Sequence, residues 1–168
     1  MKPLFSYIIG SLFLLGGATS CTKADAPPQP PFFVQATKDQ LPWTATGTGI
    51  FSKARQQFYV FGQIGTATPQ EMLTLGFALP ASPQLTPVQA LPASWVTLVG
   101  GDIISNRYAT ADTTSLPTLE ITRLDTVAKV VEGRFRTTLV RDKHLTAQTE
   151  VMVFTNGSFR VQYTTVPL

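Results

Sequence analysis

The chain has 168 residues, of which 43% are hydrophobic and only 14% are charged. This length suits one globular domain with a short extension, and the composition excludes a highly charged disordered protein. Thirteen prolines and 12 glycines disfavour a helical bundle, while the single cysteine and single histidine exclude a disulfide framework or a Cys/His zinc cluster within one chain.

Residues 1–20 have the pattern of an export signal and are set apart from the folded domain. Lys2 gives a positive start, and an apolar run follows at residues 4–15. At about a dozen residues, this run is shorter than the roughly 20 that a membrane-spanning helix needs. The small residues 16–20 then precede Cys21, as cleavage by a signal peptidase requires.

An apolar run and small residues directly before a lone cysteine resemble the signal of bacterial lipoproteins. That resemblance implies a thioether from Cys21 to diacylglycerol, cleavage before this residue and acylation of the new amine. We therefore predict lipidation of Cys21, with ordinary secretion and an incidental cysteine as the alternative. An unpaired cysteine is unusual in an oxidising compartment, which favours lipidation. No later segment has transmembrane length, so we expect a membrane anchor rather than a span.

Residues 21–31 are predicted to form the lipidated cysteine and a Pro-rich tether. Four of the last five residues of this segment are proline. Such a composition favours extended polyproline II structure, at about 3 Å per residue. The functional interpretation is a stalk that holds the domain away from the membrane, and the alternative is a disordered leader without a role.

Residues 32–168 are predicted to form a single all-β domain, because apolar residues recur with a period of two. The segments with this pattern are rich in aromatic and β-branched residues and lie at 57–64, 72–79, 119–124, 132–139 and 151–154. Turn residues separate them at the spacing of a sandwich or barrel. We therefore predict a mostly antiparallel β-sandwich or flattened barrel with little helix.

Two connections within this domain have distinctive sequences. Asn156-Gly157 lies between apolar residues 151–154 and an alternating segment at 159–163, which predicts a two-residue hairpin turn. Residues 80–93 contain four prolines, which predicts a long loop rather than a central strand.

Five short blocks follow one another along the domain. They are Trp43-Thr44-Ala45, Tyr108-Ala109-Thr110, Leu119-Glu120-Ile121-Thr122, Gly133-Arg134-Phe135 and Asn156-Gly157-Ser158-Phe159. In this order they resemble a family of small bacterial lipoproteins with a β-sandwich domain of unknown function. The resemblance implies the fold and an envelope location, and it supplies no catalytic residues.

The sequence contains no catalytic motif, and we predict no enzyme activity, no cofactor and no metal. The only histidine, His144, lies in a polar cluster typical of a solvated loop rather than of a hydrolase triad. No nucleophile elbow or phosphate-binding loop is present. A Ca²⁺ site is an alternative function for four acidic residues, although turn and surface positions explain them more simply. They are Asp102, Asp112, Glu120 and Asp125.

Trp95 and Tyr108 are the candidate ligand-binding residues. They border the Pro-rich segment and the Gly100-Gly101 turn, and exposed flat rings beside polar groups suit a sugar. The alternative is a place in the core, where large aromatic residues are usually found.

Two tripeptides resemble an Asp-Ser/Thr-apolar acceptor for bacterial O-glycosylation. They are Asp112-Thr113-Thr114 and Asp125-Thr126-Val127. Such tripeptides also arise readily in a Thr-rich chain, so glycosylation is left open.

These features predict a lipid-anchored protein of the cell envelope that acts as a non-catalytic binding or structural module. Thr22, rather than an aspartate, follows the lipidated cysteine, which favours the outer membrane, on its periplasmic or its surface-exposed side. The alternatives are a carbohydrate- or peptide-binding accessory of an envelope complex, with a glycan or envelope protein as partner, and a small hydrolase that uses scattered carboxylates. The basic residues are scattered along the chain, which disfavours nucleic-acid binding.

Overall fold

The computed structural model describes residues 31–65, 70–78, 88–144 and 149–167. Its elements are β1 (Phe33–Lys38), β2 (Leu41–Ser52), β3 (Gln57–Ile64), β4 (Glu71–Ala78), β5 (Gln89–Val99), β6 (Ile103–Ala109), β7 (Thr118–Asp125), β8 (Val130–Arg141) and β9 (Val151–Val166). The prediction of an all-β domain is confirmed. The part of the chain that the structure describes contains no helix of the length and apolar character that crossing a membrane requires.

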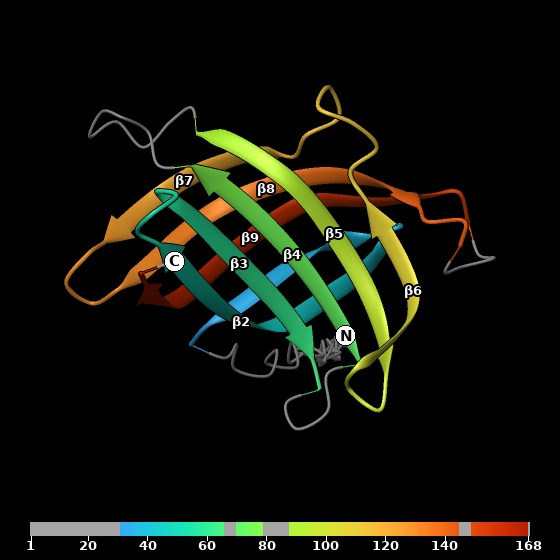
Figure 1. The fold of residues 1–168 in the computed structure, drawn as a ribbon, viewed down its shortest axis with the longest axis horizontal. Helices are drawn as coiled ribbons and strands as arrows, with labels where there is room; N and C mark the ends of the chain where they lie inside the picture. Colours follow the sequence, from blue (N-terminus) through green and yellow to red (C-terminus); the bar gives the residue numbers. More distant parts are fainter. Residues whose placement is uncertain (1–30, 66–69, 79–87, 145–148, 168) are drawn as a thin grey trace, which may run out of the picture.

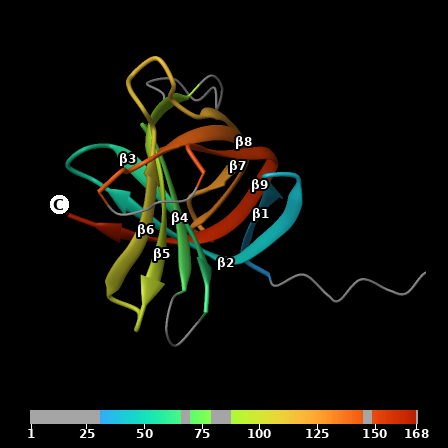
Figure 2. The ribbon, with the colours of Figure 1, turned by 90° about the vertical axis from the view of Figure 1, so that its right-hand side faces the viewer.

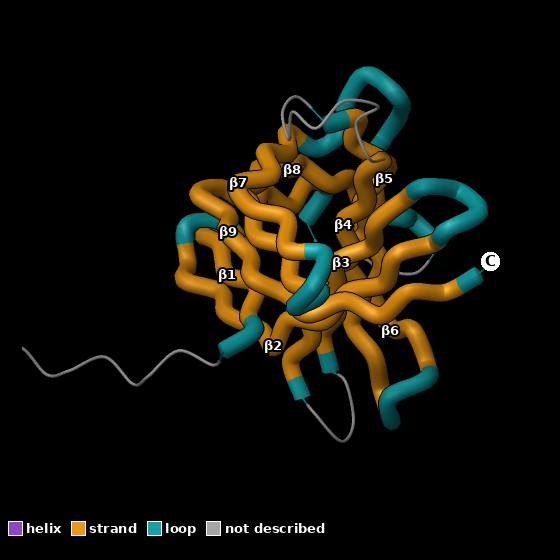
Figure 3. Tube along the Cα trace, turned by 90° about the vertical axis from the view of Figure 1, so that its left-hand side faces the viewer, coloured by secondary structure: helices purple, strands orange, loops and turns teal. Residues whose placement is uncertain are grey.

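The nine strands form one sheet that closes into a ring (Figure 1). Around the ring, β2, β3, β4, β5, β6, β8 and β9 follow one another, and β9 returns to β2. Only the β2–β9 pair is parallel, so the sheet is mixed rather than wholly antiparallel. Seen from its two ends, the ring has β3 to β6 in one wall and β1, β7, β8 and β9 in the other (Figures 2 and 3).

The ring is not a regular barrel, because two of its seams are incomplete. β6 meets β8 at only two residue pairs, Tyr108 with Arg141 and Ala109 with Val140. On the same edge, β7 pairs with β8 from Val130 to Arg136 and ends the sheet, so residues 137–139 have no partner strand there among the described residues. At the other seam, β1 lies between β9 and β2 at one end, and β2 meets β9 directly at the other.

The interior of the ring is filled by apolar side chains. Side chains alternate between the two faces of each strand, which gives the burial pattern of β8 and β9 its period of two. The largest fully buried side chains are Tyr108, Phe58, Phe77, Phe154, Phe159, Leu73, Leu75, Leu139, Val34, Val60, Val131 and Val161. The domain is therefore held together by one core inside the ring.

Asn156 and Gly157 do not form the predicted hairpin turn. β9 runs through both residues, and Asn156 adopts the left-handed conformation with φ 51° inside the strand. The pairing with β8 shifts here, from Phe135 opposite Gly157 to Thr137 opposite Phe154. Two residues of β9 thus oppose the single residue Arg136, which is a β-bulge. The hairpin prediction was wrong because a bulge favours the same residue type as a tight turn.

The Pro-rich segment is only partly a loop. β5 begins at Gln89 and pairs with β4, so the prediction of a loop over residues 80–93 is wrong for 89–93, and residues 79–87 lie outside the described residues. The register shifts between the pairs Thr74–Ser94 and Gly76–Leu91, which places Pro92 in a bulge. Proline is tolerated there because a bulged residue does not need to donate to the ladder.

The phenol of Tyr163 is expected to make the stability of the domain sensitive to alkaline pH. Burial raises the pKa of Tyr163 above its usual value of 10.0, and the negative charge of Asp125 raises it further. The folded state therefore holds this proton more tightly than the unfolded chain does. The resulting stabilisation is complete below the unfolded pKa and is lost as the pH rises through the folded pKa.

We therefore expect the free energy of unfolding to fall more steeply above about pH 10 in the wild type than in Tyr163→Phe. Urea denaturation of both proteins between about pH 8 and about pH 11.5 measures this difference. Parallel curves over that range would show that Tyr163 ionises equally well in the folded and unfolded states.

Candidate functional site

Trp95 and Tyr108 lie inside the ring rather than at its surface. Trp95 is 4% exposed and Tyr108 is fully buried. The two residues are partners in the β5–β6 ladder, and their rings meet edge to face at 5.8 Å between centroids. The Tyr108 hydroxyl donates a hydrogen bond to the Thr149 carbonyl oxygen at 3.1 Å. Neither ring presents a face to solvent, so the prediction of an exposed sugar platform is wrong and both residues belong to the core.

A polar cluster covers Trp95 on the β1 side. The Lys38 ammonium lies 4.5 Å from the centroid of the Trp95 ring and 3.1 Å from Glu71 Oε2. The Trp43 indole N–H donates to the same Glu71 oxygen at 3.0 Å. Both donors fix the Glu71 carboxylate in place. The cluster therefore links β1, β2, β4 and β5 and has a structural role.

The four acidic residues considered for Ca²⁺ do not converge. Among the described residues, no group of three or more His, Cys, Asp or Glu side chains could hold a metal ion. Asp112 and Asp125 instead organise two separate turns. Asp112 Oδ1 accepts hydrogen bonds from the Thr114 and Ser115 amides at 2.8 and 3.0 Å. Asp125 Oδ1 accepts from the Val127 and Ala128 amides at 3.1 and 2.8 Å.

The hydrogen bonds in these turns stabilise the charged carboxylates. The Thr114 hydroxyl, which donates to Asp112 at 2.7 Å, is the main reason that the pKa of Asp112 lies below its ordinary value. The amide of Ala128 has the same effect on the pKa of Asp125. These two turns contain the tripeptides that resemble glycosylation acceptors, and Thr113 and Thr126 are exposed there.

His144 is exposed in the turn after β8. Its backbone amide donates to Asp142 Oδ1 at 3.0 Å, which makes another aspartate-organised turn. The position agrees with the solvated loop expected from the sequence.

The candidate binding site is a hollow on the outer face of β7, β8 and β9. It has a volume of about 360 Å³ and is lined by Thr118, Glu120, Arg134, Phe135, Arg136, Asn156, Gly157 and Ser158. Because alternate side chains of a strand point to opposite faces, Phe135 enters the core while Arg134 and Arg136 project outward. We call this hollow the arginine groove.

Neighbouring strands supply the walls of the arginine groove. On β7, Glu120 is the pairing partner of Arg134, and Thr118 is the partner of Arg136. On β9, Ser158 is the partner of Arg134, and the bulge residue Asn156 lines the groove near Arg136. The bulge thus brings an exposed amide side chain to the groove.

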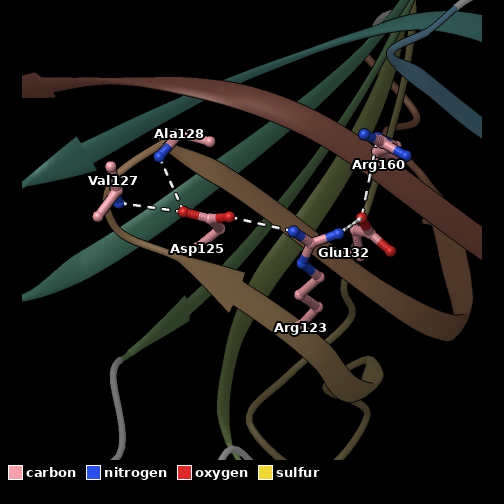
Figure 4. A network of polar contacts seen from close by, with 6 residues as sticks. All are labelled: Arg123, Asp125, Val127, Ala128, Glu132 and Arg160. Atoms are coloured by element: carbon pink, nitrogen blue, oxygen red, sulfur yellow. Dashed lines mark hydrogen bonds and ion pairs between the residues drawn. The ribbon is translucent and has the colours of Figure 1, made fainter.

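Arg134 and Arg136 differ from the other arginines of this face in having no partner. Among the described residues, neither guanidinium makes an ion pair or a hydrogen bond. By contrast, Arg123 donates to Asp125 at 3.0 Å and to Glu132 at 3.5 Å, and Arg160 lies 3.8 Å from Glu132 (Figure 4). The outer face therefore has one half in which arginines and carboxylates form ion pairs. In the other half, Arg134 and Arg136 make no ion pair, although Glu120 lies beside them.

The chemistry of the groove suits an anion. Two residues along a strand span about 6.6 Å, so the two guanidinium groups originate close together on one face. Guanidinium forks bind carboxylate, sulfate or phosphate oxygens through paired hydrogen bonds. Ser158 Oγ accepts a hydrogen bond from Gln35 Nε2 at 3.0 Å, which leaves the serine hydroxyl as a donor beside Arg134.

A second hollow continues the arginine groove. It has a volume of about 380 Å³ and is lined by Ser115, Leu116, Thr118, Arg136, Thr137 and Thr138. Thr118 and Arg136 line both hollows. The second hollow lies where β8 passes from its pairing with β7, which reaches Arg136, to its pairing with β6, which begins at Val140. The incomplete seam of the ring thus extends the groove along β8.

Comparisons with protein-family models, with curated proteins and with solved structures find no match to this chain.

Proposed function

We propose that this protein is a non-catalytic binding module of the cell envelope, anchored by lipid on Cys21, and that the arginine groove binds an anionic group. The observation that carries the binding role is the pair of unpartnered, outward guanidinium groups of Arg134 and Arg136. The lipoprotein signal and the order of the short sequence blocks support the anchor and the envelope location. Cys21 itself lies outside the described residues.

Binding without catalysis fits the groups that line the groove. Glycosidases use two carboxylates on either side of the scissile bond, separated by about 5–10 Å. Glu120 is the one carboxylate among the residues that line the groove. The remaining polar groups are guanidinium, hydroxyl and amide groups, which bind anions and sugars but do not activate water. A hydrolase built on scattered carboxylates is therefore the weaker alternative.

Removal of both arginines is expected to weaken anion binding by at least about tenfold. Hydrogen bonds to charged groups contribute about 1.5–3 kcal/mol each, and about 1.4 kcal/mol corresponds to a factor of ten. The measurement is an NMR titration of the mature chain with inorganic phosphate, followed at the arginine Nε–H signals. In the wild type, the signals of Arg134 and Arg136 should shift and saturate, and Arg134→Ala/Arg136→Ala should lose the binding. Salt should weaken it, since both side chains are exposed.

The matched control is Lys53→Ala/Arg55→Ala, which removes the same charge from the exposed β2–β3 turn. This control is expected to bind phosphate as the wild type does. Equal weakening in the two double variants would mean that overall charge, rather than the arginine groove, attracts the anion.

A further inference from the structure

We infer that the arginine groove takes an extended acidic glycan, a sugar polymer that carries carboxylate or sulfate groups along its chain. This inference rests on the proposed anion site and names the class of its ligand.

The first argument is the continuity of the two hollows. Each has a volume within the range of a small-molecule site, at about 360 and 380 Å³. Because Thr118 and Arg136 line both hollows, Arg136 lies where the two hollows meet. Arg134 lines the first hollow only. A small anion at Arg134 and Arg136 leaves the second hollow empty. A chain of several sugar units occupies both and keeps its charged groups at the two arginines.

The second argument is the lining of the hollows. Ser115, Thr118, Thr138 and Ser158 present hydroxyl groups, and Asn156 presents an amide. Each of these groups both donates and accepts hydrogen bonds, as the hydroxyl groups of a sugar do. Together with the guanidinium groups, they match a ligand that combines acidic groups with many hydroxyls.

The third argument separates a glycan from an acidic peptide. Extended peptides usually gain affinity by adding a strand to a free sheet edge, where the main chain of the protein forms new hydrogen bonds. Arg134 lies on β8 where this strand is paired with β7 on one side and β9 on the other. At Arg134 the main chain is therefore already engaged on both sides, so only side chains contact the ligand there, which favours a ligand rich in polar groups of its own. The edge of β8 at residues 137–139 and the outer edge of β7 are the places near the groove where a peptide strand would add, and oligoglutamate tests them.

The fourth argument separates a glycan from a nucleic acid. Single-stranded nucleic acids are usually held by bases that stack on exposed aromatic rings. Phe135 is the one aromatic residue among those that line the two hollows, and it is only 4% exposed. The groove therefore offers no surface for base stacking, whereas its guanidinium, hydroxyl and amide groups pair with the acidic and hydroxyl groups of a glycan.

Isothermal titration calorimetry of the full mature chain, purified in detergent, tests the inference. The probes are galacturonate, its trimer and its hexamer for carboxylates, and heparin fragments of matched lengths for sulfates. We expect affinity to rise at least about tenfold from the monomer to the hexamer of one series, which is about 1.4 kcal/mol. Arg134→Ala/Arg136→Ala should abolish binding of the hexamer. Thr138→Trp, which fills the second hollow, should remove most of the gain from chain length.

The other outcomes overturn the inference in different ways. If phosphate binds but chain length adds nothing in either series, the extended ligand is wrong and the anion site stands. If a neutral hexasaccharide binds equally well, the acidic groups are not recognised. If oligoglutamate or single-stranded DNA binds as tightly, with the same loss in the arginine variant, the ligand class is wrong. If neither phosphate nor any oligomer binds, the proposed binding function falls as well.

Discussion

Replacing Phe58 with alanine is expected to lower the free energy of unfolding by about 3–5 kcal/mol. Phe58 is 2% exposed and lies at the centre of an aromatic cluster inside the ring. Its ring stacks on Phe51 at 4.7 Å and on Phe77 at 5.1 Å, and Tyr163 meets it edge to face at 4.8 Å. Alanine would leave a cavity between β2, β3, β4 and β9, whose paired backbones limit collapse. Domains of this size are stable by only about 5–15 kcal/mol, so the loss is a large share of the total.

Two further substitutions separate core packing from a general sensitivity to mutation. Phe58→Leu keeps most of the apolar volume and should cost less than Phe58→Ala. Val127→Ala, at a side chain that is 93% exposed, should stay within about 0.5 kcal/mol of the wild type. Urea denaturation followed by circular dichroism gives all three values. A loss below about 1 kcal/mol for Phe58→Ala would mean that this cluster is not a packed core.

The strands could be predicted because their signal is local. In β8, residues 133, 135, 137 and 139 are buried while the residues between them are exposed, and the sequence shows this alternation at Arg134, Phe135 and Arg136. The closure of the ring could not be predicted in the same way. The parallel pairing of Thr48–Ser52 with Gln162–Val166 joins segments far apart in the chain, and neither segment alone indicates its partner.

Asn156 shows how one local signal supports two structures. Met152 and Phe154 point inward before the bulge, and Phe159 and Val161 point inward after it, so the buried positions change from even to odd numbers. A hairpin and a bulge both permit such a change. The choice depends on β8, which pairs with both halves of β9 and therefore holds them in one strand.

The candidate site was missed in the sequence for a related reason. Arg123, Arg134, Arg136 and Arg160 all occur in strands, and the sequence does not show which of them have carboxylate partners. Only the register of β7, β8 and β9 shows that Arg123 and Arg160 are neutralised while Arg134 and Arg136 are free. The aromatic residues that suggested a site were instead needed to fill the ring, as the burial of Trp95 and Tyr108 shows.

Replacing Cys21 with serine is expected to abolish fatty-acid labelling of the protein while leaving the folded domain intact. Several acyl chains on one residue anchor a protein stably, because each buried CH₂ group contributes about 0.8 kcal/mol. Serine has no thiol to form the thioether, so the whole anchor depends on this one sulfur atom. The buried core of the described residues begins at Val34, so the same substitution should leave the unfolding midpoint of the domain unchanged.

Metabolic labelling with a radioactive fatty acid compares acylation in the wild type and the variant, and membrane fractionation of the wild type shows whether the labelled protein is held at the membrane. Thr22→Ser is the matched control, since it changes the neighbouring residue and keeps the thiol, and it should be labelled as the wild type is. Wild-type protein that carries no label and remains soluble would show that Cys21 only lies near an ordinary cleavage site. The prediction of a lipid anchor would then be wrong. The arginine groove would still be tested by the phosphate titration, because binding by Arg134 and Arg136 does not depend on attachment of the chain to a membrane.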